Sequence, residues 1–227
     1  MRVSVVIPTY NEGAAIGRVL ADIPADQVSE VVVVDSNSTD GTADVASRIG
    51  ARVVREPRRG YGRACLTGLE HLVSPDVVVF LDGDYSDRPA ELGKLLTPIR
   101  EGRADLVVGS RLAGAREPRA LPRHSVWGNR LAALLIRLLY GVTLTDLGPF
   151  RAARYHLLRG LALSETTYGW PVEMIARAAR RKARIVEVPV SYHPRIGTSK
   201  ISGTLRGSIG AGWGIFSGIL KYRLRPP

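Results

Sequence analysis

Asp82 and Asp84 are the two residues of this chain whose type and spacing point most directly to chemistry. They follow an apolar run at residues 77–81, which is typical of a buried strand, so both carboxylates would stand at a strand end. Two carboxylates held this close repel each other unless a positive charge lies between them. Their oxygens suit Mg²⁺ or Mn²⁺, which commonly share their coordination with a phosphate. An acidic turn is the alternative interpretation, because Asp and Gly are common turn residues.

Alternating strand-like and helix-like segments precede and follow this pair. Strands are expected at residues 3–7, 31–34, 51–54, 77–81 and 105–108, and helices at 14–22, 42–49, 63–72 and 90–100. Nearly continuous apolar strands separated by helices indicate an α/β fold with a mostly parallel sheet flanked by helices. Ligands of such sheets bind beyond the carboxyl ends of the strands, where the strand order reverses. With the usual 3-2-1-4 winding, residues 8–12, 35–38 and 82–84 would meet in one crevice.

The second half of the chain is less regular and more basic. We expect a loop at 114–123, helices at 127–140 and 172–181, and an edge strand at 185–190. Residues 1–110 hold 12 Lys/Arg against 16 Asp/Glu, whereas residues 111–227 hold 20 against 5. This asymmetry favours an anionic partner for the second half, such as a phosphate or an anionic membrane surface. A nucleic-acid partner is not expected, because basic motifs interleaved with aromatic residues are missing from the sequence.

The C-terminal region contains 14 consecutive uncharged residues, 207–220, followed by Lys221, Arg223 and Arg225. A helix of this length would span about 21 Å, less than the ~30 Å hydrocarbon core of a bilayer. It could instead lie in a membrane interface with its cations at the headgroups, or pack back on the domain. Five glycines within these residues weaken the helix prediction.

Other classes of protein are disfavoured by what the sequence lacks. The single cysteine, Cys65, permits no internal disulfide, and the start of the first expected strand close to Met1 leaves no room for a signal peptide. We therefore expect a cytoplasmic protein, peripheral on the cytoplasmic face of a membrane. The glycine patterns of dinucleotide-binding and P-loop sites are also missing after the first strand.

Five motifs in register resemble family 2 glycosyltransferases of the GT-A fold. They are Ile7-Pro8-Thr9-Tyr10-Asn11-Glu12, Val34-Asp35-Ser36-Asn37-Ser38-Thr39-Asp40-Gly41-Thr42, Gly60-Tyr61-Gly62-Arg63-Ala64, Phe80-Leu81-Asp82-Gly83-Asp84 and Gly109-Ser110-Arg111. The segments 146–151 and 199–204 are similar to acceptor-side segments of the dolichyl- and polyprenyl-phosphate sugar transferases, a group that includes dolichyl-phosphate mannose synthase. The resemblance covers residues 2–205.

That resemblance implies a function and a set of site residues. It implies an inverting, metal-dependent hexosyltransferase that moves a hexose from a UDP- or GDP-sugar to a polyprenyl phosphate, with Mg²⁺ or Mn²⁺ as cofactor. Residues 1–110 would form the nucleotide-sugar half, 111–205 the acceptor half of the same domain, and 206–227 an apolar and basic tail. The nucleotide sugar would contact Pro8, Tyr10, Glu12, Asp35, Asp82 and Gly83, the metal would contact Asp82 and Asp84, and the acceptor phosphate would contact Arg111, Arg123, Arg130 and Lys200.

Asp146 has two open roles among the expected catalytic residues Asp84, Arg111 and Asp146. It could be the general base that a hydroxyl acceptor requires, or it could orient an arginine for a phosphate acceptor, which needs little deprotonation. A base at Asp146 would fit the first alternative function, a transferase that acts on a sugar or small-molecule hydroxyl. A separate alternative is a non-catalytic basic module that docks on membranes. The donor base, the sugar, the lipid length and the oligomeric state stay open.

Overall fold

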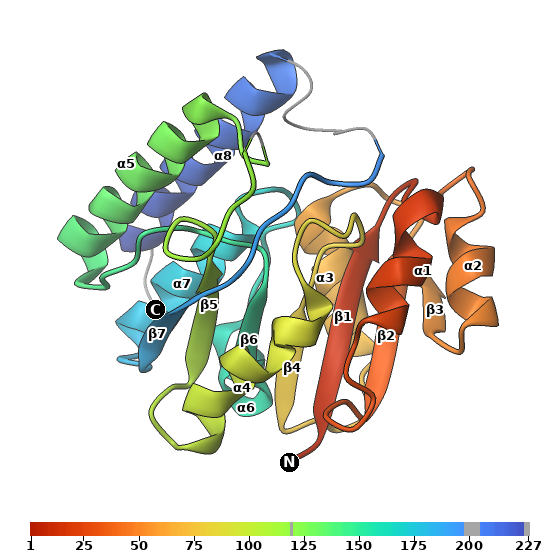
Figure 1. Ribbon diagram of the computed structural model, residues 1–227. Coiled ribbons are helices and arrows are strands. Elements are labelled where there is room, and N and C mark those ends of the chain that lie inside the picture. Colours follow the sequence, from red (N-terminus) through yellow and green to blue (C-terminus); the bar gives the residue numbers. More distant parts are fainter. Residues whose placement is uncertain (119, 198–204, 225–227) are drawn as a thin grey trace.

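A seven-stranded, mostly parallel sheet forms the centre of the protein, and helices cover both of its faces (Figure 1). The structure, a computed structural model, describes residues 1–118, 120–197 and 205–224. The strand order is β3-β2-β1-β4-β6-β5-β7, and β6 runs antiparallel to both of its neighbours. The strands are β1 (Val3–Thr9), β2 (Glu30–Asp35), β3 (Arg52–Arg55), β4 (Val77–Phe80), β5 (Leu106–Ser110), β6 (Arg151–Arg154) and β7 (Ile185–Pro189). The helices are α1 (Gly13–Ala21), α2 (Thr42–Arg48), α3 (Tyr61–Glu70), α4 (Leu92–Arg100), α5 (Arg123–Tyr140), α6 (Tyr155–Leu161), α7 (Trp170–Arg180) and α8 (Leu205–Leu224), with a 3-10 turn at Pro89–Glu91.

Alternation along the strands divides the buried residues between two cores. Val5 and Ile7 of β1 pack with α1, α2 and α4 on one face. Val6 faces the other core, in which side chains from α3, α5, α6, α7 and α8 are buried. Apolar residues on both faces of the strands are what a parallel sheet covered on both sides requires.

The predicted α/β class, the first five strands and the 3-2-1-4 winding are confirmed. The parallel register pairs Thr9 with Asp35 and Val6 with Phe80, so the polar segments that follow these strands leave the sheet at the same edge. Strand β7 is at the edge of the sheet, as predicted. Among the described residues, β6 and α6 are elements that the sequence did not predict. The sequence of β6 is Arg-Ala-Ala-Arg, which lacks the β-branched residues that mark a strand.

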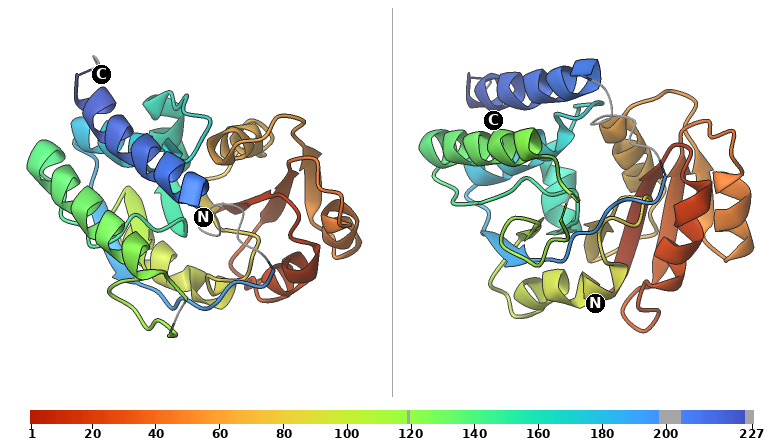
Figure 2. Two further views of the ribbon diagram at one scale, coloured as in Figure 1. Left: turned by 90° about the horizontal axis from the view of Figure 1, so that it is seen from above. Right: turned by 45° about the horizontal axis from the view of Figure 1, so that its top comes forward.

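The C-terminal uncharged segment lies within the long helix α8, despite its glycines. Helix α8 lies beside α5 in both views of Figure 2, and the Tyr140 hydroxyl donates to the carbonyl of Ile219 at 2.6 Å. Ile219 and Tyr222 are buried, so the described end of α8 packs on the domain. Among the residues that the structure describes, no helix combines the length and apolar character needed to cross a bilayer.

Asp105, just before β5, links three neighbouring strands at the end of the sheet where β5 and β7 begin and β6 ends. Its carboxylate accepts bonds from the backbone and guanidinium of Arg184, at 2.7–3.0 Å, and lies 3.5 Å from Arg154. The Arg184 hydrogen bond is the main cause that lowers the pKa of Asp105 to about 2. A carboxyl whose pKa is lowered by folding stabilises the protein above its unfolded pKa of 3.8, and that stabilisation is lost as the pH falls toward 2.

We therefore expect Asp105→Asn to lower the Tm at pH 5–7, and the difference from wild type to shrink as the pH falls from 4 to 2. Thermal unfolding followed by circular dichroism across this range measures it. Asp26→Asn, at an exposed position, is the control and should leave the curve unchanged. A Tm difference between Asp105→Asn and wild type that stays constant with pH would contradict the assignment.

Candidate active site

A cavity of about 290 Å³ lies at the carboxyl ends of β1, β2 and β4, where the strand order reverses. Its lining residues are Pro8, Thr9, Tyr10, Glu12, Ser36, Arg59, Gly60, Tyr61, Ala64, Asp82, Gly83, Asp84, Tyr168 and Arg195. The predicted convergence of the segments after these three strands is therefore observed. Of the residues expected to hold the nucleotide sugar, Asp35 alone is absent from this lining, although it is adjacent to Thr9 in the sheet.

Asp82 and Asp84 occupy different surroundings within this cavity. Asp84 Oδ1 accepts bonds from the backbone N–H and the hydroxyl of Ser86, at 2.9 and 2.5 Å, while Oδ2 lies 2.9 Å from Arg195. Asp82 Oδ1 is buried and has no hydrogen-bond partner among the described residues. Burial, and next the nearby charge of Asp84, raise the pKa of Asp82 well above its ordinary range. Asp84 is thus paired with a cation, whereas the Oδ1 atom of Asp82 has no partner among the described residues.

Arg195 supplies part of that charge from a distant segment. Its guanidinium lies 2.9 Å from Asp84 and 3.3 Å from Glu12. The backbone that carries it is fixed to the Asp84 loop, because the N–H groups of His193 and Ile196 donate to the carbonyls of Ser86 and Asp84, both at 2.9 Å. In Figure 1 this segment runs from β7 across the top of the sheet toward β1.

The donor set fits a hard divalent cation shared with a diphosphate. In the described part of the chain no cluster of three or more His, Cys, Asp or Glu side chains could hold a metal, so the protein would supply two carboxylates. Phosphate oxygens and water would complete the coordination, as is usual for Mg²⁺. The buried, unpartnered Oδ1 of Asp82 is the atom that such a cation would satisfy.

The other side of the cavity combines an aromatic ring with a cation. The guanidinium of Arg59 stacks over the ring of Tyr10, 4.2 Å from its centroid, and hydrogen-bonds to its hydroxyl. Glu12 is buried at the start of α1, and its backbone N–H donates to the Thr42 hydroxyl. Asp35 is also buried; one oxygen accepts the Ser38 N–H at 3.1 Å, while Oδ1 is unpartnered among the described residues. Ring, cation and carboxylate oxygens together can bind a nucleoside and its phosphates.

Close backbone contacts explain the glycines of this site. A Cβ on Gly62 would lie 2.2 Å from the carbonyl oxygen of Glu165, and one on Gly60 would lie 2.3 Å from that of Thr166. The start of α3 can therefore approach the 165–166 segment only with glycine at both positions. A Cβ on Gly83 would likewise meet the Thr9 side chain at 2.8 Å, which keeps the acidic loop close to β1.

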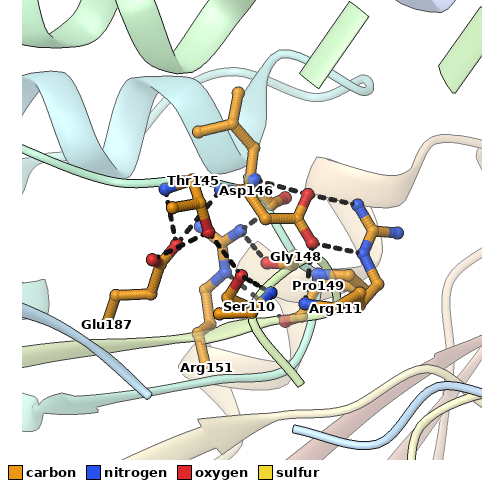
Figure 3. A network of polar contacts seen from close by, with 10 residues as sticks. Ser110, Arg111, Thr145, Asp146, Gly148, Pro149, Arg151 and Glu187 are labelled. Carbon is orange, nitrogen blue, oxygen red and sulfur yellow. Dashed lines mark hydrogen bonds and ion pairs between the residues drawn. The ribbon is translucent and has the colours of Figure 1, made fainter. Parts of the chain in front are cut away.

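Asp146 forms a two-pronged ion pair with Arg111 (Figure 3). Arg111 Nε and Nη2 lie 2.7 and 2.8 Å from the two Asp146 oxygens, which also accept the backbone N–H groups of Arg111 and Leu147. Burial favours the neutral carboxyl, but the Arg111 charge and these bonds outweigh it, so the pKa of Asp146 is lowered. Asp146 thus orients an arginine whose charge acts on Asp82. A carboxylate engaged in this way is poorly suited to the role of general base.

Two further residues, the half-buried Glu187 and the buried Arg151, hold the Asp146 loop in place, as Figure 3 shows. Glu187 of β7 accepts the backbone N–H groups of Thr145 and Asp146, at 2.8 and 3.1 Å. Arg151 is fully buried and donates to the carbonyls of Leu147, Gly148, Pro149 and Pro171. Backbone carbonyls therefore accept the hydrogen bonds of the Arg151 guanidinium, although no carboxylate pairs with it among the described residues.

The remaining predicted acceptor residues lie elsewhere. Arg123 begins α5 and Arg130 is on its surface; both are exposed, and neither lines the cavity. Lys200 and the motif around it fall outside the described residues. Contact of these three side chains with an acceptor phosphate stays a prediction.

Sequence analysis missed Arg59, Arg195 and Asp87 as residues of this region. Arg59 directly precedes the Gly60-Tyr61-Gly62 motif, which was a usable indication. Nothing in the sequence indicated that Arg195 would cross to Asp84. Asp87 is buried with both oxygens unpartnered among the described residues; burial, and next the charge of Asp82, raise its pKa well above the ordinary range.

Comparison with known proteins places the chain in a family. The profile described as "Glycosyl transferase family 2" matches residues 4–161, more than half of the chain, and the protein belongs to this family of enzymes. An uncharacterised glycosyltransferase of Mycobacterium tuberculosis is 41% identical over 214 residues, covering 91% of this chain and 93% of the relative. A dolichyl-phosphate hexose transferase of Haloferax volcanii is 38% identical, covering 98% and 96%. An undecaprenyl-phosphate mannosyltransferase of Micrococcus luteus is 36% identical, covering 91% and 90%.

A solved structure with the same fold carries ligands. Glucosyl-3-phosphoglycerate synthase of Mycobacterium tuberculosis, in complex with Mn²⁺, UDP and glucosyl-3-phosphoglycerate, superposes with a TM-score of 0.78 at 27% identity. The match covers all of this chain and 81% of that one. The GT-A fold that the sequence resemblance implied is thereby confirmed.

Proposed function

We propose that this enzyme transfers a hexose from a UDP- or GDP-sugar to a polyprenyl phosphate. The observation that carries the proposal is Arg111, a buried cation fixed by Asp146 beside the acidic end of the cavity. A phosphate acceptor is already an anion, so it needs a positioned positive charge more than a base. Two of the relatives named above are polyprenyl-type phosphate transferases, which supports the same acceptor class.

Each part of the site would have a distinct task. Tyr10 and Arg59 would hold the nucleotide, while Asp82 and Asp84 would hold Mg²⁺ or Mn²⁺. The cation would stabilise the negative charge that grows on the leaving diphosphate. Arg195 would turn from the carboxylates toward that diphosphate, and Arg111 would hold the acceptor phosphate in line with the anomeric carbon.

A hydroxyl acceptor is the second candidate, because one observation favours it. Asp82 is a buried carboxyl with an unpartnered oxygen and a raised pKa, which are properties of a general base. The solved neighbour is named a glucosyl-3-phosphoglycerate synthase, and its structure holds phosphoglyceric acid, a molecule that carries both a phosphate and a hydroxyl. The two candidates differ in the bond that the anomeric carbon forms: a bond to a phosphate oxygen in the first, and a glycosidic bond to the oxygen of an alcohol in the second.

The deciding experiment has two steps. Thermal shift against UDP- and GDP-sugars with Mn²⁺ identifies the donor, since a ligand at 100 times its Kd stabilises by about 2.7 kcal/mol, or roughly 5–10 °C in Tm. Transfer of radiolabelled sugar is then measured to a short-chain polyprenyl phosphate, to the matching polyprenol and to phosphoglycerate. We expect product with the polyprenyl phosphate alone, and the product should release its sugar in mild acid. Transfer to phosphoglycerate or to the polyprenol, but not to the lipid phosphate, would establish the hydroxyl mechanism instead.

A further inference from the structure

Helix α5 presents a row of large apolar side chains away from the protein. Trp127, Leu131, Leu134 and Leu138 are 70%, 50%, 50% and 70% exposed. Their spacing of four, three and four residues places them along one side of the helix, and we call them the α5 ridge. Single exposed apolar residues are ordinary, whereas an unbroken row on one helix marks an interaction surface.

The opposite side of α5 already secures the helix to the domain. Ala132, Ala133 and Ile136 are buried, and Leu135 and Leu139 pack against the same core. The α5 ridge is thus not needed to hold the helix in place. Figure 2 shows α5 and α8 at the periphery of the molecule, where a large flat partner can reach them.

The charges around the α5 ridge identify the partner. Helix α5 carries Arg123, Arg130 and Arg137 and contains no Asp or Glu. The Arg130 guanidinium lies 5.9 Å from the centre of the Trp127 ring, so a cation accompanies the aromatic residue. Apolar side chains in a row, with arginines beside them and a Trp among them, match the requirements of the interface of an anionic bilayer.

A second copy of this chain is a poorer occupant. A two-fold contact would bring the same patch of each copy together, and with it the arginines of both helices. That contact would set like charges against each other, whereas anionic headgroups neutralise them. The ridge extends over about 16 Å of helix at 1.5 Å per residue, long enough for α5 to lie flat in the headgroup region.

We propose that α5 is a membrane-docking helix, which inserts the α5 ridge into the interface of an anionic bilayer and places its arginines among the headgroups. The inference rests on the proposed function for its purpose, since a polyprenyl phosphate is presented from a membrane. It assigns docking to α5, whereas the sequence left open whether the segment at 207–220 lies in a membrane interface or packs on the domain.

Vesicle co-sedimentation tests the proposal without requiring catalysis. The probes are large unilamellar vesicles of phosphatidylcholine with about 30% phosphatidylglycerol, and of phosphatidylcholine alone. We expect wild-type protein to bind the anionic vesicles more strongly, and less so at high salt. The double variant Leu131→Gln/Leu138→Gln should lower the partition coefficient about tenfold or more. Ile49→Gln, at a 49% exposed apolar position on another surface, is the matched control and should bind as wild type does.

The outcomes separate docking from catalysis. Equal vesicle binding by wild type and the double variant, or no binding by wild type, would overturn the proposal. So would light scattering that shows a wild-type dimer and a monomeric double variant. Transfer to a water-soluble short-chain polyprenyl phosphate should be the same in both proteins. If neither protein transfers sugar, the proposed function fails, and the vesicle result still decides the docking role of α5.

Discussion

Asp84→Asn is expected to lower kcat by about 10²–10³-fold or more, with the fold intact. Both carboxylate oxygens of Asp84 are held in place: Ser86 donates hydrogen bonds to one, and Arg195 forms an ion pair with the other. An amide keeps the shape of this side chain but removes its charge, so both a divalent cation and Arg195 lose their partner. Because stabilisation of the leaving diphosphate is a transition-state effect, the loss should appear mainly in kcat.

Metal binding provides a readout of the same variant that does not depend on turnover. Titration of Mn²⁺ in the presence of UDP, followed by electron paramagnetic resonance, should show weaker binding by Asp84→Asn than by wild type. Asp26→Asn, which removes an exposed carboxylate outside the cavity, should match wild type in both assays. Activity of Asp84→Asn within a few-fold of wild type would mean that the charge is stabilised by another group.

The first half of the site could be predicted because it depends on local sequence. Pro8, Asp35 and Asp82 each stand at or just after an apolar strand, and parallel winding places the ends of such strands at one edge. The sequence motifs show which residue types are present, and the parallel topology shows that they lie at the same edge of the sheet. Neither step requires knowledge of side-chain contacts across the molecule.

The second half could not be predicted in the same way, because its contacts join distant segments. Arg195 reaches Asp84 across 111 positions of sequence, through a segment that no local pattern identifies as part of the site. Strand β6 has no apolar β-branched residue, so the antiparallel insertion between β4 and β5 was not expected. Arg123 and Arg130 were chosen for their charge alone, and the structure places both on the surface of α5.

The acidic and basic residues of the site come from different halves of the chain. The acidic residues of the N-terminal half of the chain converge on the cavity. Among the described residues, Arg195 and Arg111 bring positive charge to Asp84 and Asp82, and both belong to the C-terminal half. The arginines of the C-terminal half therefore have different roles. Two arginines serve the acidic site, while those of α5 face outward beside the α5 ridge.

Asp146→Asn tests the most deeply buried of these pairings and is expected to lower stability strongly. Asp146 is fully buried and the Arg111 side chain is 11% exposed, so the variant leaves a guanidinium charge without its partner in a dry site. Breaking a buried pair in this way costs about 3–5 kcal/mol, which corresponds to a fall in Tm of roughly 6–20 °C for a chain of this size. Thermal unfolding at pH 7.5, with and without the donor nucleotide, provides the measurement.

Two further variants distinguish an orienting carboxylate from a base. The double variant Arg111→Met/Asp146→Leu should recover much of the lost stability, because no buried charge is then left unpaired, yet it should lack transfer to a phosphate acceptor. Glu101→Gln, which breaks the exposed pair with Arg103, is the control and should change Tm little. An orienting role predicts that Asp146→Asn keeps the wild-type pH dependence of its residual activity, since no proton-accepting group has been removed. Loss of the acidic limb of that profile, where activity rises as a general base deprotonates, with Tm unchanged, would instead make Asp146 the base and favour a hydroxyl acceptor.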